Sequence, residues 1–208
     1  MEIEYKGATA ITIKSGSSVN VVVDPKLSSV GLKDLKITDA IELATDTDLA
    51  IDNDQKILIN GPGEYEVSGV TIKGISVPRF KDANGRKVTV YRLEVGGARI
   101  AILGHIQDVL DEAQLEGIGV VDILIVPVGG NNYTLDAHAA VKIVNQIDPR
   151  IVIPVHYADK AVKYDVAQDD LSSFLKEMSA QEHEVVDKLK IKNGIVPAAR
   201  TVYELNRS

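Results

Sequence analysis

"VDILIVPVGGNNYTLDAHAAVKIVNQIDPRIVIPVHY", residues 121–157, is the stretch that decides the fold of this chain. Its two ends, 121–130 and 150–157, are apolar runs typical of strands buried on both faces. Four apolar residues between them share one face of a helix: Ala140, Ile143, Val144 and Ile147. Thr134 or Asp136 can cap the start of this helix. A strand, a helix and a strand in this length predict a right-handed parallel crossover, with "GG" and "HY" at one sheet edge.

The rest of the chain adds strands before this unit and one helix after it. "AITIK" and "NVVVDP" predict a hairpin around residues 15–20, and further short strands follow in the first half. "DDLSSFLKEMS" (169–179) has helical periodicity, and "RTVYEL" (200–205) alternates as a last strand does. The charged stretch around His183 is helix-like. Without repeat or linker, the chain is expected to form one domain, residues 1–208, of α+β class.

Composition narrows the functional classes. The 208 residues carry a formal net charge of −7, and no dense Lys/Arg run provides the surface that a phosphate backbone requires, so no nucleic-acid partner is expected. No apolar run is long enough for a membrane span, and the alternating start does not resemble a signal peptide, which favours the cytoplasm. With no cysteine in the chain, any metal must be held by His, Asp or Glu.

Four segments together carry a family resemblance: "MEIEYKGATAITIK…VVVDP", "GPGEYEVSGVTIKGISV" (61–77), "ARIAILGH…VDILIVPVGG" and "RIVIPVHY". In this order and at this spacing they resemble the metallo-β-lactamase-fold hydrolases. The most similar branch is that of the L-ascorbate-6-phosphate lactonase-like proteins and predicted zinc-dependent hydrolases. The resemblance covers about residues 1–175. It implies a four-layer αββα sandwich with an active site along one edge.

The same resemblance locates the family's ligand positions. That family holds two divalent metals with a His-x-His-x-Asp-His loop, followed by a His, an Asp and a last His. The first loop falls on Thr45, Thr47, Leu49 and Ala50, or one residue later on Asp46, Asp48, Ala50 and Ile51. Neither register contains a histidine. The next position falls near Arg79, His105 replaces the aspartate, and His156 alone matches the family outright.

Two hypotheses about function follow. The first is a degenerate member without the two-metal hydrolytic centre and with no cofactor. It would bind a small anion through Arg79, His105, His156 and the amides of "VGGNN", since guanidinium groups grip phosphate and carboxylate. It could instead serve as an assembly partner or homo-oligomer.

The second hypothesis is a metal-dependent hydrolase with one Zn or Mn. The metal would lie on His105, His156 and either Asp46 or Asp48, because two imidazoles and a carboxylate suit such a metal. Its substrate would be a lactone or a phosphoester.

Overall fold

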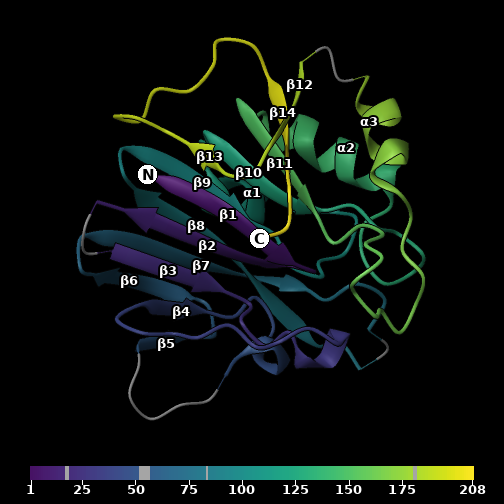
Figure 1. Cartoon of the computed structure of the whole chain (residues 1–208), viewed down its shortest axis with the longest axis horizontal. Helices are drawn as coiled ribbons and strands as arrows, with labels where there is room; N and C mark the ends of the chain where they lie inside the picture. Colours follow the sequence, from purple (N-terminus) through teal and green to yellow (C-terminus); the bar gives the residue numbers. More distant parts are fainter. Residues whose placement is uncertain (17–18, 52–56, 83, 180–181) are drawn as a thin grey trace.

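The computed structural model describes residues 1–16, 19–51, 57–82, 84–179 and 182–208. Two β-sheets pack against each other, and the α-helices cover the outer face of the larger sheet (Figure 1). The α+β class expected from the sequence is thereby confirmed, with two stacked sheets as in the expected sandwich.

The smaller sheet has six strands in the order β13-β1-β2-β3-β4-β5. Their bounds are Glu2–Gly7 for β1, Ala10–Ser15 for β2, Val19–Val23 for β3, Ile41–Leu43 for β4, Ile57–Ile59 for β5 and Leu189–Lys190 for β13. Antiparallel pairing of β2 with β3 confirms the predicted hairpin, and β3, β4 and β5 run parallel. The parallel strands therefore end at a common edge.

The larger sheet has eight strands in the order β12-β14-β11-β10-β9-β8-β7-β6. Their bounds are Gly63–Val67 for β6, Val70–Pro78 for β7, Lys87–Val95 for β8, Ala98–Ile102 for β9, Ile123–Pro127 for β10, Ile151–Val155 for β11, His183–Val186 for β12 and Thr201–Leu205 for β14. Strands β9, β10 and β11 are parallel neighbours. The stretch around His183 is thus a strand, β12, and the helix-like reading of it was wrong, because pairing with β14 decides its conformation.

The predicted crossover is present. Helix α2 (Ala137–Ile147) connects β10 to the parallel strand β11, and the Asp136 carboxylate caps it by accepting from the Ala139 amide at 2.8 Å. Helices α1 (Glu112–Ile118) and α3 (Leu171–Met178) lie on the same side of the sheet (Figure 1). Two hydrophobic clusters result, one between the sheets and one between the larger sheet and the helices.

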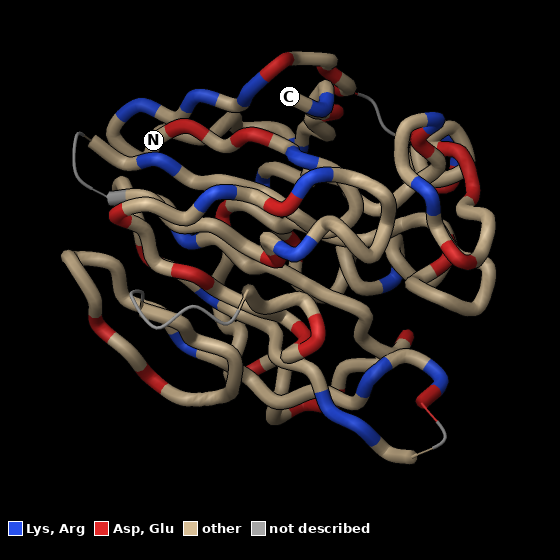
Figure 2. The backbone as a smooth tube through the Cα atoms, turned by 60° about the horizontal axis from the view of Figure 1, so that its bottom comes forward, with Lys and Arg blue, Asp and Glu red and all other residues tan. Residues whose placement is uncertain are grey.

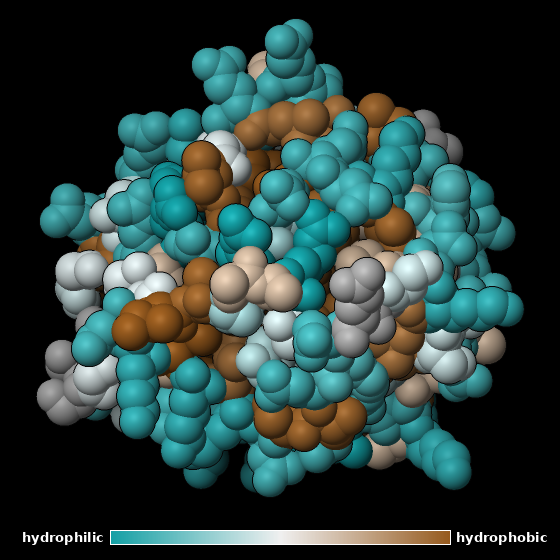
Figure 3. All heavy atoms as spheres, turned by 90° about the horizontal axis from the view of Figure 1, so that it is seen from above, coloured by the Kyte–Doolittle hydropathy of each residue, from teal (hydrophilic) through white to brown (hydrophobic). Residues whose placement is uncertain are grey.

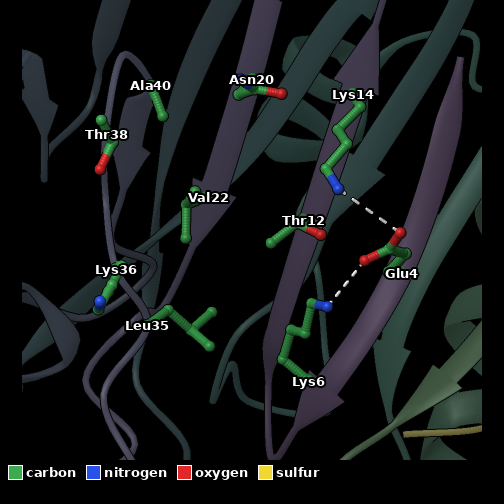
Figure 4. Close-up of a pocket in the computed structure, with 10 residues that line it drawn as sticks. All are labelled: Glu4, Lys6, Thr12, Lys14, Asn20, Val22, Leu35, Lys36, Thr38 and Ala40. Atoms are coloured by element: carbon green, nitrogen blue, oxygen red, sulfur yellow. Dashed lines mark hydrogen bonds and ion pairs between the residues drawn. The ribbon is translucent and has the colours of Figure 1, made fainter. Parts of the chain in front are cut away.

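The outer face of the smaller sheet differs from a helical layer. Among the described residues, the 3-10 turn η1 (Ser28–Val30) and the chain around it cover one end of this face, where Leu27 packs on Ala8 and Ala10. Beside them lies a polar groove of about 290 Å³, in which Glu4 pairs with Lys6 at 2.7 Å and with Lys14 at 3.6 Å (Figure 4). The fourth layer of this protein is therefore mainly irregular chain.

The surface is polar and carries mixed charge. Basic and acidic residues are interspersed along the backbone (Figure 2), and the face seen from above is mostly hydrophilic with small hydrophobic spots (Figure 3). Within the described ranges, no helix is long and apolar enough to cross a membrane.

Candidate functional site

Buried polar residues gather where the parallel strands end. Asp24 follows β3, Asp46 lies shortly after β4, His105 follows β9, and His156 follows β11. Each of the four is at most 5% exposed. Polar side chains are costly to bury without partners, so their contacts define what this edge can do chemically.

Two imidazoles meet at the centre of this edge. The Nε2 atoms of His105 and His156 lie 3.3 Å apart, and the two rings are nearly perpendicular, at 86°. The rings of Tyr133 and Tyr164 flank them. The ring centroid of Tyr133 lies 5.0 Å from that of His105, and the ring centroid of Tyr164 lies 4.6 Å from that of His156. The pair is therefore enclosed by aromatic rings.

The backbone holds His156 in an unusual conformation. Its φ is +55°, in the left-handed region that non-glycine residues seldom adopt. Its amide donates to the Ala8 carbonyl at 2.9 Å, and its Nδ1 lies 3.2 Å from Oε1 of Gln168. Three anchors, strand β11, Ala8 and Gln168, thus fix the direction of the imidazole.

Burial keeps both imidazoles neutral. It lowers the pKa of His105 to about 4, with a further contribution from the Arg79 charge, and the pKa of His156 to about 3, with a further contribution from His105. Neutral imidazole is the form that ligates metals.

The loop after β4 forms ion pairs with the β7–β8 connection. The Asp46 carboxylate accepts from Nε of Arg79 at 2.9 Å and from Nη2 of Arg86 at 3.1 Å. The same Nη2 of Arg86 donates to Asp48 at 2.7 Å, and Arg79 also faces Asp82 at 3.6 Å. Both aspartates of this loop, Asp46 and Asp48, are therefore paired with arginines.

Asp24 holds the start of that loop. Its carboxylate accepts from the Thr45 amide at 2.7 Å and from the Thr45 hydroxyl at 2.8 Å. Complete burial nevertheless raises the pKa of Asp24 to about 6, because desolvation outweighs the hydrogen bonds from Thr45 and Thr9.

Of the residues singled out in the sequence, the structure brings together His105 and His156 as one pair, and Asp46, Asp48 and Arg79 as an ion-pair cluster next to it. Arg79 is bridged to Ile106, the residue after His105. Among the described residues, no group of three or more His, Cys, Asp or Glu side chains is placed to hold a metal ion. The guanidinium group of Arg79 forms ion pairs with Asp46 and Asp82.

The histidine pair nevertheless fits a single metal. Two nitrogens bound to one tetrahedral Zn²⁺ lie roughly 3.3 Å apart, since each Zn–N bond is about 2.0–2.1 Å. The Nε2 atoms have this separation. The two Nε2 atoms could therefore serve as ligands of one metal.

Sequence reasoning missed several neighbours of the pair. Tyr133, Tyr164 and Gln168 lie in irregular chain between the regular elements, where no periodicity marks them. Arg86 was missed because its partner Asp46 is 40 residues away. A clue existed only for Gln168, which is an uncharged polar residue shortly before helix α3.

Comparison with known proteins identifies a family, two related sequences and a similar solved structure. The family model for the beta-lactamase superfamily domain matches residues 2–156. A UPF0173 metal-dependent hydrolase of Thermococcus onnurineus is 29% identical over 140 residues, which are 58% of this chain and 61% of that protein. One from Carboxydothermus hydrogenoformans is 39% identical over 67 residues, which are 32% of this chain and 29% of that protein, so each match spans less than two thirds of the relative's length.

A solved structure from Thermotoga maritima, assigned by name to the Zn-dependent hydrolases of the metallo-beta-lactamase superfamily, is 26% identical. It superposes with a TM-score of 0.77 and covers 98% of this chain and 97% of that one. These names contradict the expectation of no cofactor, because the relatives are named for their dependence on a metal. The missing histidines of the first loop exclude only the family's usual ligand set, and they do not exclude a metal on other residues. With its family-model match over most of its length, the chain belongs to the beta-lactamase superfamily domain family, whose members include relatives named as metal-dependent hydrolases.

Proposed function

We propose that this protein is a metal-dependent hydrolase with a reduced, single-metal centre on His105 and His156. The observation that supports it is the 3.3 Å separation of the two buried Nε2 atoms. The relatives named as metal-dependent hydrolases support hydrolysis as the reaction class. Since Asp46 and Asp48 are paired with arginines, the geometry favours two imidazole ligands over the set that includes a loop aspartate.

The chain's own residues provide ligands and enclosure. His105 and His156 would hold the metal in neutral form, and Gln168 orients the second imidazole. A divalent metal bound there supplies Lewis acidity that polarises a substrate carbonyl or phosphoryl oxygen. Tyr133, half-buried and edge-on to His105, shields this imidazole from solvent.

A cavity beside the Tyr133 loop, lined by neither His105 nor His156, offers a place for the part of a substrate that extends away from the histidine pair. It has a volume of about 570 Å³, and its polar lining includes Gln107, Asn131, Asn132 and Thr134. Its charged side chains are Asp108, Asp136, Asp169 and Lys81. Three carboxylates against one ammonium disfavour a phosphate, whereas amides and carboxylates suit hydroxyl groups. We therefore favour an uncharged, hydroxylated lactone over a phosphoester.

Metal content is the first test. Protein loaded with Zn²⁺ or Mn²⁺ and dialysed should retain one metal per chain, measured by inductively coupled plasma mass spectrometry. His105→Ala and His156→Ala should lose it. His138→Ala is the matched control, because His138 is exposed on α2 and pairs with Glu177. No retained metal, or metal that survives both substitutions, would disprove the proposal.

Hydrolysis is the second test. The loaded protein should open hydroxylated lactones faster than it cleaves aryl phosphates of similar size, and both activities should disappear in His156→Ala. A preference for the phosphates would overturn the substrate class, and activity that survives His156→Ala would overturn the site.

A second candidate is a non-catalytic member that retains the metal and binds a small molecule or assembles with copies of itself. It is favoured by the enclosure of the pair, in which His105 is 5% and His156 1% exposed. One bound metal without hydrolysis of either substrate class would support it. Size-exclusion chromatography with light scattering would test the assembly.

A further inference from the structure

The orientation of the Gln168 amide follows from its second partner. Nε2 of Gln168 lies 2.8 Å from the carbonyl oxygen of Val166, which can only accept a hydrogen bond. The amide nitrogen must therefore point to Val166, and Oε1 must point to His156 at 3.2 Å. The orientation is thus set by hydrogen-bond chemistry.

This orientation decides which nitrogen of His156 carries the proton. Because Oε1 of Gln168 can only accept, Nδ1 of His156 must donate, and Nε2 of the neutral ring then has a free lone pair. That lone pair faces Nε2 of His105 at 3.3 Å. In the metal-free protein, His105 can complete this contact only by donating from Nε2.

The remaining nitrogen agrees with the assignment. If His105 is protonated at Nε2, its Nδ1 is an acceptor, and this atom is buried without a partner in the described structure. A buried acceptor without a donor is less costly than a buried N–H without an acceptor. The opposite tautomer of His105 would bury an N–H that has no described acceptor.

Gly129 makes room for this arrangement. A Cβ at position 129 would collide with the His156 carbonyl oxygen and with Oε1 of Gln168. The Gly129 carbonyl also accepts from the Asp169 amide at 2.7 Å, which fixes the chain next to Gln168. The Gln168–His156 contact is therefore built into the packing of two strand-end segments.

We propose that Gln168 is a positioning residue that fixes His156 as the Nδ1–H tautomer. In the metal-free protein, Nε2–H of His105 then donates a hydrogen bond to Nε2 of His156, and a bound metal would replace this hydrogen bond. A metal needs a lone pair on both Nε2 atoms, so its binding moves the proton of His105 from Nε2 to Nδ1. The inference rests on the proposed function for its metal-bound half only. Its metal-free half stands on the hydrogen-bond chemistry alone.

Long-range ¹H–¹⁵N correlation spectra of ¹⁵N-histidine-labelled, chelator-treated protein would test the metal-free half. We expect His156 as Nδ1–H and His105 as Nε2–H, with both signals assigned by single substitutions. In Gln168→Met, which keeps the length but loses the acceptor, His156 should become a tautomer mixture. An Nε2–H tautomer of His156 in the wild type would overturn the proposal even if the variant does not fold.

Zn²⁺ titration of the same sample would test the metal-bound half. His105 should change to Nδ1–H on saturation, and Gln168→Met should weaken Zn²⁺ binding by about 10- to 100-fold, the usual cost of losing a hydrogen bond to a ligating imidazole. Gln146→Met is the matched control, because Gln146 is exposed on α2. Unchanged affinity in Gln168→Met would overturn the positioning role. A wild type that binds no Zn²⁺ would overturn the proposed function and the switch, whereas the tautomer assignment would be judged by the metal-free spectra.

Discussion

The buried carboxyl group of Asp24 makes a pH-dependent prediction that can be isolated with Asp24→Asn. Burial raises its pKa from the ordinary 3.8 to about 6 in the folded protein. The folded state therefore binds the Asp24 proton more tightly than the unfolded state does. Its contribution to the free energy of unfolding is complete below pH 3.8 and is lost as the pH rises through 6.

The magnitude follows from the size of the shift. About two pKa units correspond to about 3 kcal/mol in total, of which about 1.4 kcal/mol is lost between pH 5 and pH 8. Asparagine keeps an oxygen for the Thr45 amide and an amide that can donate to the Thr45 hydroxyl, so its own contribution does not titrate. Relative to the wild type, Asp24→Asn should therefore gain about 1.4 kcal/mol of stability from pH 5 to pH 8.

Urea unfolding of both proteins at several pH values between 5 and 8 would measure this difference. Subtracting the two curves removes the titration of all other groups, together with any constant cost of the altered hydrogen bonds. Asp165→Asn, an exposed position, controls for the same chemical change on the surface. The reasoning would be refuted if the difference in free energy of unfolding did not change with pH, or if the wild type became more stable relative to the variant as the pH rises.

Three further predictions concern the site and the core. Because the pKa of His105 is lowered to about 4 and that of His156 to about 3, both imidazoles contribute stability that is complete above pH 6.5 and is lost progressively as the pH falls from there to the folded pKa values. Between pH 7 and pH 5 the two imidazoles of the chelator-treated protein should lose about 4 kcal/mol of stabilisation, against about 1.3 kcal/mol gained from Asp24 over the same range. In Asp24→Asn, where that gain is absent, a constant denaturant midpoint would contradict the prediction. Asp46→Ala should cost about 2 kcal/mol in urea unfolding, because Arg79 loses its closest carboxylate, and a change under 0.5 kcal/mol would show the pair to be solvent-screened. Ile125→Ala should cost about 2–5 kcal/mol, because Ile125 is fully buried between strands and leaves a cavity, and a loss below that range would mean that the core collapses around the smaller residue.

The family's metal ligands and this chain's ion pairs occupy the same loop. In the first-loop positions, Asp46 pairs with Arg79 and Arg86, so the guanidinium groups bring positive charge to this carboxylate. A metal on His105 and His156, as proposed above, would be held without the loop aspartates. This separation explains how a chain without the first-loop histidines can belong to a family with members named as metal-dependent hydrolases.

The sequence by itself determined the strand–helix–strand crossover of residues 121–157 and the direction of its strands. Two apolar runs of strand length flank a helix with a 3.6-residue apolar repeat, and this order within a short length of chain predicts a parallel crossover. From the parallel strands it also followed that the residues after β9 and β11, His105 and His156, end at one edge. The sequence thus predicted that the two histidines lie close together, and the structure places their Nε2 atoms 3.3 Å apart.

Only the tertiary structure decided the partners of those residues. The Asp46–Arg86 pair joins positions 40 residues apart, and the Gln168–His156 contact depends on how an irregular segment packs on Gly129. Neither follows from a local pattern, because side-chain pairing across loops depends on which loops the fold places together. For the same reason, the sequence did not show that irregular chain covers part of the smaller sheet's outer face. The polar face of a strand can be exposed to solvent or covered by other chain, and only the packing of the folded protein decides which.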